Sequence, residues 1–456
     1  MSLGEFFSNL QFDADAFQRQ AAAALDAGQS VVVTAPTGAG KTLVAEAGIH
    51  LAFERNCRVF YTTPLKALSN QKFADFSAAY GTPAVGLLTG DNSIRGDAPL
   101  VVMTTEVLRN MIYADSSALD GLKLVVLDEV HYLQDPLRGM VWEEVIIHLP
   151  SDVQVACLSA TIANPEEFTS WVESRRGATA LIIERQRPVP LQSLYLLKQR
   201  HHGGALQDAP LFIGAERGPN TQLASLLRRN RNRYGRFGTP RRGEVASWLE
   251  QAGMLPAIYF VFSRRGCDEA AAAVASMLTF TSQDERETIA SHAATRTAHL
   301  PPGELSALGY GSWLEMLRHG VAAHHAGLVP AFKETVEDLF SSGILKLVFA
   351  TETLALGINM PAKSVVLDKL SRFTGKGHRL LEPGDYTQLT GRAGRRGIDD
   401  RGTAVVLHSR FVPFDRVVGI AGPGAHPLRS SFRPNYNMAV NLVAIHTRSQ
   451  AEDVLR

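Results

Sequence analysis

The chain has 456 residues, of which 45% are apolar and 20% are charged, and its formal net charge at pH 7 is +1. This length predicts two or three compact domains, and the apolar content is sufficient for their cores. The near-zero net charge excludes nucleic-acid binding through an overall positive field, so such binding must depend on local basic patches. No apolar run reaches the ~20 residues that cross a bilayer, and the N-terminus lacks a basic region followed by an apolar one. We therefore expect a cytoplasmic protein without membrane association.

The three cysteines, Cys57, Cys157 and Cys267, lie far apart and form no C-x-x-C or metal-binding spacing. Such scattered cysteines indicate buried, reduced thiols of a cytosolic protein rather than a disulfide framework. We therefore expect no cysteine-based metal site.

Residues 35–42, Ala-Pro-Thr-Gly-Ala-Gly-Lys-Thr, follow the apolar run Val31–Val33 and precede an amphipathic stretch from Leu43 to Phe53. This order predicts a strand, a loop and a helix, in which backbone N–H groups and the helix dipole bind a polyphosphate. In such a loop Lys41 can reach the terminal phosphates, and the Thr42 hydroxyl can ligate Mg²⁺. The residues expected to bind the nucleotide here are Thr37, Gly38, Ala39, Gly40, Lys41 and Thr42. The loop predicts a nucleoside triphosphate site without stating what the energy is used for.

Short apolar runs alternate with helical patterns between about residue 14 and residue 183. The predicted strands are Val31–Val33, Val59–Tyr61, Leu100–Met103, Leu124–Leu127, Val155–Leu158 and Ala180–Ile183. Their Val-, Leu- and Ile-rich composition without alternation is typical of a parallel sheet that is covered on both faces. Asn164, followed by Pro165 and two glutamates, predicts the N-cap and first turn of a helix.

The alternating pattern weakens between about residue 184 and residue 250, where glycines and prolines are scattered. A basic cluster without acidic residues occurs there and consists of Arg228, Arg229, Arg231, Arg233, Arg236, Arg241 and Arg242. We interpret this stretch as a basic connector or insertion. Its arginines either contact a nucleic acid or form a solvated link, and we favour the link.

A second series of apolar runs begins after residue 250. The predicted strands are Ala257–Phe262, Val321–Ala323, Leu345–Phe349, Ser364–Leu367 and Thr403–Leu407. They indicate a second α/β unit. After about residue 428, a segment that contains Phe432 and Tyr436 precedes one more amphipathic helix.

Two adjacent carboxylates, Asp128 and Glu129, follow the apolar run Val125–Leu127. Ligands bind at the carboxyl ends of strands in open α/β sheets, so we expect these side chains near the phosphate loop. Asp128 can hold Mg²⁺ through its water shell, and Glu129 can orient the water that attacks the γ-phosphate or accept its proton. We therefore predict a metal site formed by Thr42, Asp128 and Glu129, and interpret His131 as a structural histidine.

Two further motifs carry groups suited to a nucleotide site. The tripeptide Ser-Ala-Thr at 159–161 follows a predicted strand, where its hydroxyl groups could link the nucleotide site to a moving partner. In the second unit, Gln388 begins the run Gln-Leu-Thr-Gly-Arg-Ala-Gly-Arg-Arg-Gly. Guanidinium groups suit phosphate oxygens and developing transition-state charge, so Arg392 and Arg395 are predicted to act in hydrolysis. Gln388 is a candidate nucleotide contact.

In chain order, the phosphate loop, Asp-Glu-Val-His at 128–131, Ser-Ala-Thr at 159–161 and the arginine motif at 388–397 resemble the motifs of superfamily-2 helicases of the DExH type. Further matches make the chain similar to the Ski2/Mtr4-like group. They lie at 12–18 (F-x-x-D-x-F-Q), 63–68 (TPLKAL), 88–91 (LTGD), 104–108 (TTEVL), 255–264 (LPAIYFVFSR), 324–328 (HHAGL), 350–361 (ATETLALGINMP) and 432–438 (FRPNYNM). From about residue 10 to residue 445 the sequence looks like the helicase core of the actinobacterial HelY branch of this group.

The resemblance implies two tandem RecA-like domains, each an α/β doubly wound parallel sheet, with the nucleotide cleft between them. It also implies ATP and Mg²⁺ as cofactors. Phe12 would stack on adenine, Gln18 would bond its edge, Glu352 would touch the ribose, and Arg392 and Arg395 would act as arginine fingers. A single nucleic-acid strand would contact Pro64, Lys66, Thr89, Gly90, Thr105, Glu106 and Arg109 in the first domain and Ser263, Arg264, His325, Thr351 and Thr353 in the second. Hydroxyl and amide groups that bind phosphates recognise no base, which allows a motor to step.

A glycine-rich turn between two partly apolar arms in residues 366–382 predicts a hairpin. In related helicases a hairpin at this place separates the strands of a duplex. We therefore propose residues from Phe373 to Arg379 as the strand-separating pin, with Phe373 contacting nucleic acid. A plain connecting hairpin remains the alternative.

The expected organisation is an N-terminal segment at 1–13, a first helicase domain at 14–183, the basic connector at 184–250, a second helicase domain at 251–427 and the start of a winged-helix-like region at 428–456. Ski2/Mtr4-like proteins continue into a winged helix and a helical bundle. The chain stops at Arg456 and therefore corresponds either to a piece of a longer protein or to a reduced one.

The predicted function is ATP-dependent movement along single-stranded or overhang-bearing nucleic acid. By resemblance we expect RNA as the favoured strand, 3′-to-5′ polarity, duplex unwinding and RNA-degradation machinery as a partner. The alternatives are ATP-driven remodelling of ribonucleoprotein or DNA translocation without unwinding, and, from another class, a non-catalytic nucleic-acid-binding scaffold.

Overall fold

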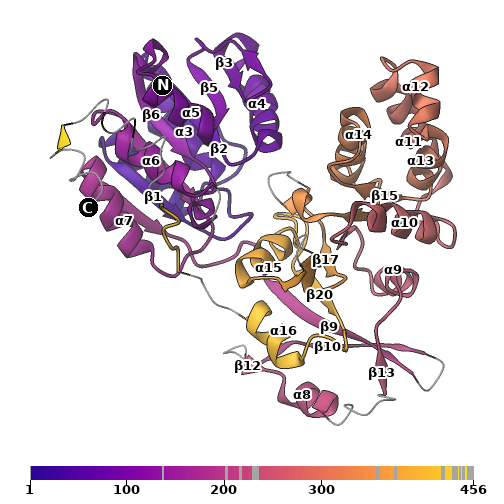
Figure 1. Ribbon diagram of the computed structural model, residues 1–456. Helices are drawn as coiled ribbons and strands as arrows, with labels where there is room; N and C mark the ends of the chain where they lie inside the picture. Colours follow the sequence, from indigo (N-terminus) through magenta and orange to yellow (C-terminus); the bar gives the residue numbers. More distant parts are fainter. Residues whose placement is uncertain are drawn as a thin grey trace. The chain divides into compact units, whose positions relative to one another are not determined.

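The computed structural model describes residues 2–135, 138–200, 204–214, 218–228, 236–355, 360–373, 377–422 and 427–433, together with residues 440, 443, 447 and 448. The chain forms two compact units, each built around a largely parallel sheet (Figure 1). The first unit contains residues 1–186 and those from 425 onward, and the second contains residues 187–424. This arrangement confirms the predicted α/β class with two doubly wound sheets.

The described strands of the first sheet lie in the order β4-β3-β5-β2-β6-β7-β1-β8. Neighbouring strands are parallel, except that β3 and β4 are antiparallel. The bounds are β1 (Ser30–Thr34), β2 (Arg58–Thr63), β3 (Val85–Leu88), β4 (Ser93–Ile94), β5 (Leu100–Thr104), β6 (Leu122–Leu127), β7 (Gln154–Ser159) and β8 (Thr179–Ile183). Every strand predicted for this region is present, whereas two were not predicted: β3, whose apolar run Gly86 interrupts, and β4, which has two residues.

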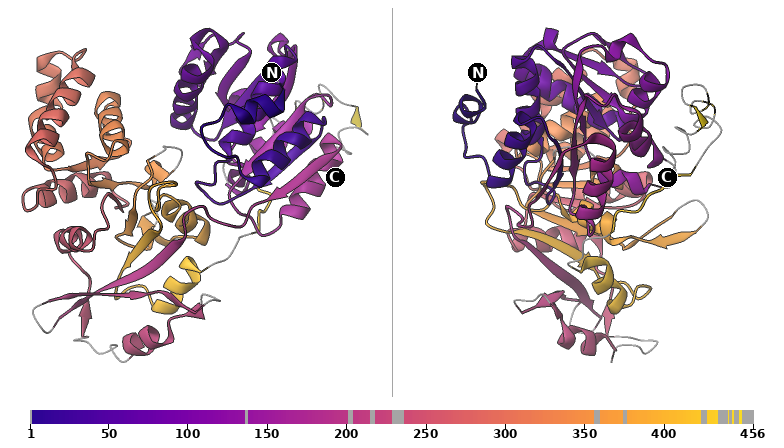
Figure 2. Two further views of the ribbon diagram at one scale, coloured as in Figure 1. Left: turned by 180° about the vertical axis from the view of Figure 1, so that it is seen from behind. Right: turned by 90° about the vertical axis from the view of Figure 1, so that its left-hand side faces the viewer.

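Helices cover both faces of the first sheet (Figures 1 and 2). Their bounds are α1 (Leu3–Ser8), α2 (Ala16–Asp26), α3 (Thr42–Glu54), α4 (Lys66–Tyr80), α5 (Thr105–Tyr113), α6 (Met140–His148) and α7 (Pro165–Arg176), with 3-10 turns η1 (Thr82–Ala84), η2 (Ser117–Leu119) and η3 (Val130–Gln134). Side chains alternate along a strand, so Val31 and Val33 pack with α2, α3 and α4, whereas Val32 packs with α5, α6 and α7. The sheet is therefore apolar on both faces, as its composition predicted.

The second sheet has the order β10-β9-β20-β17-β14-β16-β15, and β13 pairs with β9. The bounds are β9 (Leu191–Gln199), β10 (Leu206–Pro210), β13 (Phe237–Gly238), β14 (Ala257–Phe260), β15 (Val321–His324), β16 (Leu347–Ala350), β17 (Ser364–Leu367) and β20 (Gly402–Leu407). β9 is antiparallel to β10 and β13, and the other neighbouring strands are parallel. A separate two-stranded pair consists of β11 (Phe212–Ile213) and β12 (Gly218–Pro219). Every strand predicted for this region is present.

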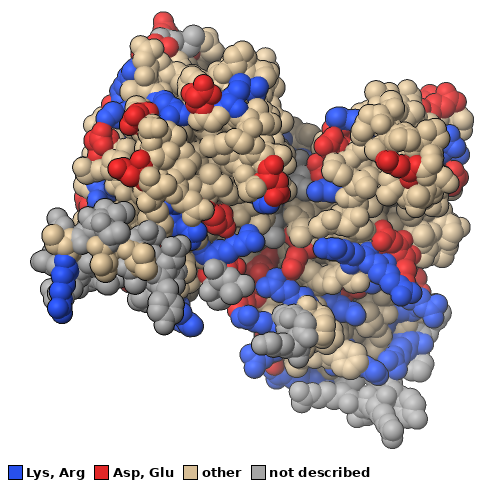
Figure 3. All heavy atoms as spheres, turned by 45° about the horizontal axis from the view of Figure 1, so that its top comes forward, with Lys and Arg blue, Asp and Glu red and all other residues tan. Residues whose placement is uncertain are grey.

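The interpretation of residues 184–250 as a connector is corrected by β9 and by α9 (Arg242–Gln251). β9 pairs in parallel with β20 from Leu191 to Leu196 and is a strand of the second sheet. Of the basic cluster, Arg228, Arg236 and Arg241 are exposed, whereas Arg242 lies 3.0 Å from the Asp368 carboxylate. Figure 3 shows bands of Lys and Arg side chains on this unit, with Asp and Glu side chains between them. Arg229, Arg231 and Arg233 lie outside the described residues.

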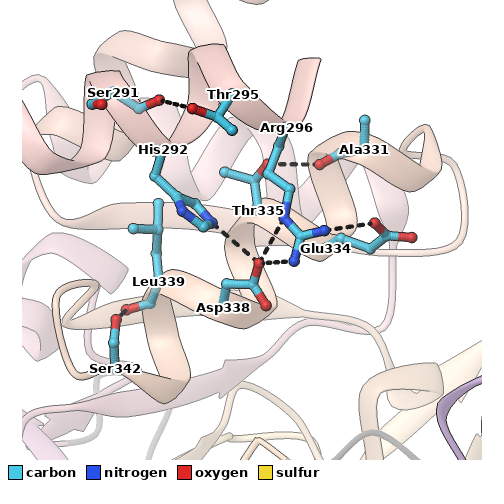
Figure 4. Close-up of polar contacts among 10 residues, drawn as sticks. All are labelled: Ser291, His292, Thr295, Arg296, Ala331, Glu334, Thr335, Asp338, Leu339 and Ser342. Atoms are coloured by element: carbon cyan, nitrogen blue, oxygen red, sulfur yellow. Dashed lines mark hydrogen bonds and ion pairs between the residues drawn. The ribbon is translucent and has the colours of Figure 1, made fainter. Parts of the chain in front are cut away.

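The second unit contains a group of helices between β14 and β15 that was not predicted. The helices of this unit are α8 (Thr221–Arg228), α9, α10 (Arg264–Ala275), α11 (Gln283–Thr297), α12 (Pro302–Ala307), α13 (Tyr310–Arg318), α14 (Pro330–Ser341), α15 (Pro383–Thr390) and α16 (Phe414–Ala421), with the 3-10 turn η4 (Glu352–Ala355). A charge cluster joins α11 to α14 (Figure 4). In this cluster Asp338 lies 3.1 Å from Nε2 of His292 and accepts a hydrogen bond from Nε of Arg296 at 2.9 Å. Arg296 also lies 3.6 Å from Glu334.

β18 (Ser371–Phe373) and β19 (His378–Leu380) form an antiparallel pair, which confirms the predicted hairpin. Phe373 at the end of β18 is 64% exposed. The tip at 374–376 lies outside the described residues, as do 356–359 and most of the segment predicted at 428–456.

All three cysteines are free thiols. Cys157 and Cys267 are buried, and burial raises the pKa of each thiol to about 12. Cys57 is half-buried, which corrects the expectation that all three would be buried. None of the helices in the described ranges combines the length and the apolar character needed to cross a membrane.

Residues 427–433 pack on the first unit, far along the chain from the helices that they contact. The Asn164 side chain donates from Nδ2 to the Leu428 carbonyl at 3.0 Å and accepts from the Leu428 N–H at 2.6 Å. The Leu428 side chain is buried in the core of α6 and α7, and the Ser431 hydroxyl donates to the Leu133 carbonyl at 2.7 Å. Asn164 occupies the N-cap position of α7 as predicted, but its side chain makes no capping hydrogen bond. Its amide binds Leu428 instead.

Glu143 on α6 lies beside this segment and is 4% exposed. Burial raises its pKa to about 7, against the opposing effect of a hydrogen bond with Ser430. Because the folded protein then holds the proton more tightly than the unfolded chain, this group lowers stability as pH rises from the unfolded pKa toward 7.

We expect Glu143→Gln to reduce the fall in Tm between about pH 5.5 and about pH 7.5, with the exposed Glu173→Gln as the control. An unchanged fall in the Glu143 variant would contradict this assignment.

Candidate nucleotide and nucleic-acid site

The residues with predicted chemistry leave the first sheet at one edge, the carboxyl ends of its parallel strands. The phosphate loop follows β1, Asp128 and Glu129 follow β6, and Ser-Ala-Thr at 159–161 overlaps the end of β7. These strands are neighbours in the order β6-β7-β1, whereas the residues predicted to bind nucleic acid follow the neighbours β3-β5-β2. The residues predicted to bind nucleotide and those predicted to bind nucleic acid therefore occupy two halves of this edge, which meet where β2 pairs with β6. We call them the nucleotide half and the nucleic-acid half.

The phosphate loop adopts a backbone that its glycines permit. Gly38 and Gly40 have φ values of 81° and 84°, where a side chain would strain the backbone. The Lys41 ammonium folds across the loop and donates to the carbonyls of Ala35 at 3.0 Å and Pro36 at 3.3 Å. α3 begins at the next residue, so its first N–H groups open onto the loop. Phosphate oxygens can replace these two carbonyls as acceptors for Lys41.

Gln18 and Phe12, both predicted to contact adenine, lie in different surroundings. Gln18 is 1% exposed; its Nε2 donates to the Gly40 carbonyl at 2.8 Å, and its Oε1 accepts from the Asp15 N–H at 2.7 Å. In this conformation Gln18 supports the phosphate loop, and its adenine contact stays a prediction. Phe12 is 55% exposed in the segment before α2, so its ring is accessible to a base.

Asp128 is 8% exposed, and both of its carboxylate oxygens accept hydrogen bonds. The Tyr61 hydroxyl donates to Oδ2 at 2.6 Å, and the Glu129 N–H donates to Oδ1 at 2.9 Å. Burial raises the pKa of Asp128, and the charge of Glu129 raises it further. The charges of Lys72 and Lys41 and the hydrogen bond from Tyr61 oppose this rise. The carboxylate thus depends on nearby donors and cations to remain charged.

Glu129 has a φ of 54°, a left-handed backbone that is uncommon for a residue with a side chain, although Asn56, Arg95 and Asp115 share it. Its carboxylate lies 3.3 Å from Nδ1 of His131. Burial lowers the pKa of His131, which favours the neutral ring at pH 7. The turn therefore presents Glu129 beside a neutral imidazole, as expected for a supporting histidine.

Thr42 and Asp128 offer a hydroxyl and a buried carboxylate, and oxygen ligands of this kind suit Mg²⁺, which keeps several waters and phosphate oxygens. Within the described ranges, no group of three or more His, Cys, Asp or Glu side chains could hold a metal ion by itself. The donor set therefore fits a metal that arrives with a nucleotide. Lys72 on α4 donates to the Thr42 hydroxyl at 3.2 Å. Its charge lowers the pKa of Asp128 and of Glu46, both of which burial raises.

In the nucleic-acid half, Lys66 is exposed at the start of α4 and forms an ion pair with Asp91. A side chain at Gly90 would contact the Lys66 ammonium, so the two loops lie side by side. The Thr89 hydroxyl accepts from the Asn92 N–H at 3.2 Å. These groups form an accessible surface at the ends of β2 and β3.

Other predicted contacts of the first unit are less accessible. Pro64 and Thr105 are buried, and the Thr105 hydroxyl donates to the Thr63 carbonyl at 3.3 Å. Glu106 is half-buried, and Arg109 lies 3.5 Å from the Glu144 carboxylate. The hydroxyl of Thr105 thus joins β2 to α5, and its contact with a strand stays a prediction.

In the second unit, predicted contacts follow β14, β16 and β15, which are neighbours in this order. Ser263 and Arg264 are exposed at the start of α10. The hydroxyl groups of Thr351 and Thr353 lie 2.9 Å apart in the loop after β16. The carboxyl edge of this sheet therefore presents small polar groups and one guanidinium.

His325 differs from these residues because it is 5% exposed. Its Nε2 lies 2.9 Å from Oδ1 of Asp268, and its Nδ1 accepts from the Gly327 N–H at 3.1 Å. With both ring nitrogens engaged, His325 holds its own loop, and its contact with nucleic acid stays a prediction.

The two predicted arginine fingers are bound by groups of their own unit. Arg395 makes two hydrogen bonds of 2.8 Å with the Asp399 carboxylate. Arg392 donates to the carbonyl of Ala355, the last residue of η4, at 2.6 Å. Gln388 is half-buried on α15. A finger role would require both arginines to exchange these acceptors for phosphate oxygens.

Glu352, the predicted ribose contact, accepts a hydrogen bond from Arg372 of β18 at 2.6 Å. Arg372 also lies 3.6 Å from Asp385 on α15. The hairpin is therefore joined to the loop after β16 by an ion pair that the sequence did not predict.

Three contributors to the site, Tyr61, Lys72 and Arg372, were not identified from the sequence. Tyr61 offered one sign, because a buried tyrosine in an aliphatic strand needs a partner for its hydroxyl. No feature of the sequence indicates the roles of Lys72 and Arg372, because the partners of these side chains depend on the rotation of α4 and the position of the hairpin.

Two family models match the sequence. A DEAD/DEAH box helicase model matches residues 15–168, and a helicase conserved C-terminal domain model matches residues 269–397. The protein named "Probable helicase HelY" from Mycobacterium tuberculosis is 51% identical over 99% of this chain and 52% of its own length. The Arabidopsis thaliana "DExH-box ATP-dependent RNA helicase DExH15 chloroplastic" is 40% identical over 97% of this chain and 41% of its own length. Human "Superkiller complex protein 2" is 38% identical over 98% of this chain and 37% of its own length. The chain therefore spans about half or less of the length of these relatives.

Replacing Glu129 tests its role directly. Glu129→Gln keeps the size of the side chain but removes the group that would take the proton from the attacking water. We expect kcat for ATP hydrolysis to fall by about 10²–10³-fold, because the group that takes the proton is lost. ADP should still bind, because the phosphate loop is untouched. Phosphate release and fluorescent ADP binding measure the two effects, with Glu167→Gln on α7 as the control. Hydrolysis at the parent rate would refute the assignment.

Proposed function

Because the chain belongs to the DEAD/DEAH box helicases and carries a helicase core of the Ski2-like group, we propose that it is an ATP-driven motor on single-stranded nucleic acid. We further propose RNA as the preferred strand, 3′-to-5′ movement and unwinding of adjoining duplex. The observation that carries the proposal is the division of one sheet edge, with nucleotide residues after β6-β7-β1 and nucleic-acid residues after β3-β5-β2. A nucleotide binder of another kind would not need the second half.

The nucleotide half accounts for binding and water activation. The N–H groups of the phosphate loop and Lys41 would bind the β- and γ-phosphates. Thr42 and Asp128 would hold Mg²⁺, which when bound neutralises phosphate charge. Glu129 would orient the attacking water and accept its proton.

The second unit would supply charge to the same reaction. Arg392 and Arg395 would stabilise the negative charge that develops on the γ-phosphate. Each now binds an acceptor of its own unit, Ala355 for Arg392 and Asp399 for Arg395. ATP would compete for these arginines and ADP would compete less well, so the two nucleotides would favour different states of the protein.

The nucleic-acid half would bind the sugar-phosphate backbone of a single strand. Lys66, Thr89 and Gly90 in the first unit and Arg264 and Thr353 in the second offer charges, hydroxyls and backbone amides without a base-reading aromatic. Such contacts are independent of sequence and let a motor advance. The name of the plant relative includes the words RNA helicase, which favours RNA as the strand. We also propose RNA-degradation machinery as a partner. Cytoplasmic location is part of the same proposal.

The proposal predicts ATP hydrolysis that is stimulated more by single-stranded RNA than by single-stranded DNA, by at least about fivefold, because the backbone contacts would favour RNA. Phosphate release with matched 20-nucleotide strands measures this, and Arg392→Ala is the control that should abolish turnover. A labelled duplex with a 3′ overhang should be unwound, and one with a 5′ overhang should not. Stimulation by both strands without unwinding would support a translocase or remodeller instead. Strand binding without any hydrolysis would indicate a scaffold.

We propose the hairpin β18–β19 as the element that separates the duplex. Phe373, at the end of β18, carries a ring that is 64% exposed and can stack on the last base pair. The Arg372–Glu352 ion pair fixes the base of this hairpin beside the loop of the predicted ribose contact. A plain connecting hairpin would need neither the exposed ring nor the ion pair.

Phe373→Ala should lower the rate of duplex unwinding by about fivefold or more, because one base-stacking contact is lost. The RNA-stimulated ATPase rate should change by less than about twofold, because no nucleotide contact is altered. Phe411→Ala is the matched control, since Phe411 is another exposed aromatic of the same unit, 79% exposed. Equal loss of ATPase and unwinding in Phe373→Ala would argue for a structural hairpin.

A further inference from the structure

Tyr61 is a buried residue of β2 that reaches the nucleotide half of the site. Its ring is 0% exposed and packs edge-on against Phe76 of α4, with the ring centroids 5.1 Å apart. Its hydroxyl donates to Oδ2 of Asp128 at 2.6 Å. The ring is therefore fixed by packing, and its only polar group points at the carboxylate predicted to hold the metal.

The backbone of β2 reinforces this contact. The Asp128 N–H donates to the Thr62 carbonyl at 3.0 Å, and the Thr62 hydroxyl donates to the Val126 carbonyl at 3.1 Å. β2 therefore holds the start of the Asp-Glu turn through its main chain and its side chains. The same strand ends at Thr63 and Pro64, where the nucleic-acid half begins.

The second unit contains the same arrangement at the same register. Tyr61 pairs with Val126 of β6, and Asp128 lies two residues beyond that partner. In the second sheet Tyr259 of β14 pairs with Val366 of β17, and its hydroxyl donates to Asp368, again two residues beyond, at 3.2 Å.

The two aspartates have different additional partners. Asp368 also binds Arg242 at 3.0 Å, so its charge is matched inside the fold. The oxygens of Asp128 accept from a hydroxyl and a backbone N–H, and the cations Lys41 and Lys72 lie near it. The shared geometry is a feature of the fold. Among the described residues no arginine binds Asp128, which leaves its carboxylate able to serve a cation.

We infer that Tyr61 is a positioning residue of the nucleotide site, which orients the Asp128 carboxylate so that it can hold the Mg²⁺ that accompanies ATP. The inference rests on the proposed function only in taking Asp128 as the metal ligand. Tyr61 itself touches neither nucleotide nor metal. Its hydroxyl fixes the rotation of the carboxylate, and its strand links that carboxylate to the nucleic-acid half.

The test compares Tyr61→Phe with Tyr259→Phe, which removes the same hydroxyl from the same register of the other sheet. Fluorescent ADP is titrated with and without Mg²⁺, the Mg²⁺ concentration for half-maximal ATP hydrolysis is measured, and Tm is recorded. We expect Tyr61→Phe to weaken ADP binding in Mg²⁺ and to raise the half-maximal Mg²⁺ concentration, each by about tenfold, since a hydrogen bond to a charged group is lost. ADP affinity without Mg²⁺ should stay within about twofold.

Tyr259→Phe should leave both Mg²⁺-dependent quantities unchanged. The inference is overturned if Tyr61→Phe lowers Tm without changing the Mg²⁺ dependence, or if ADP binding weakens equally with and without Mg²⁺. The binding measurement needs neither RNA nor hydrolysis, so it stands even if the proposed motor activity fails.

Discussion

Parallel strand alignment is the constraint on which the site depends, because it brings the ends of β1, β6 and β7 to the edge that β2, β3 and β5 share. An antiparallel strand within this group would send its loop to the opposite edge. In both sheets the antiparallel pairs among the described strands lie at the margin, at β4 in the first and at β10 and β13 in the second. The loops that carry the motifs therefore all leave the sheet at the same edge.

The same alignment buries charge, and the surrounding residues must offset that cost. Burial raises the pKa of Asp128 and of Glu46, and a buried carboxylate without partners would take up a proton and lose its attraction for a cation. Lys72 and the Tyr61 hydroxyl oppose this change. Tyr61 comes from β2 and Lys72 from α4, the helix that begins with Lys66. Elements that border the nucleic-acid half therefore help to keep Asp128 charged, together with Lys41 of the phosphate loop.

The sequence predicted the central strands of both sheets because they are apolar runs bounded by loops, and parallel burial leaves few polar positions in them. It missed β9 because Pro188 and Pro190 precede it and Gln192 and Ser193 interrupt its apolar run. It also missed α11, whose buried face consists only of Ile289, Ala293 and Thr297 on a largely polar helix. Local patterns identify a strand or a helix by its run of apolar residues. In β9 this run is interrupted, and in α11 it is confined to a narrow buried face.

For the site residues, the sequence likewise predicted positions along the chain but not contacts within the fold. Motif spacing placed the phosphate loop after β1 and Asp128 after β6, as the structure has them, because the spacing follows from the parallel fold. Spacing could not indicate that Gln18 and His325 bind groups of the protein itself. Nor could it identify Tyr61, whose role depends on strand register. Contacts within the fold require the register and rotation of each element, which a single sequence does not specify.

Within the second unit, η4 is held from two sides, and under the proposed function this arrangement would connect the nucleotide to the hairpin. Arg392 binds the carbonyl of Ala355 at its end, and Arg372 of β18 binds Glu352 at its start. If Arg392 leaves Ala355 for a phosphate, η4 loses one of its two supports, and Arg372 carries the change to β18. A half-exposed ion pair contributes only about 0–1 kcal/mol to stability, so Arg372 fixes the position of the hairpin more than it stabilises the fold. A contact this weak can break and re-form without unfolding the hairpin.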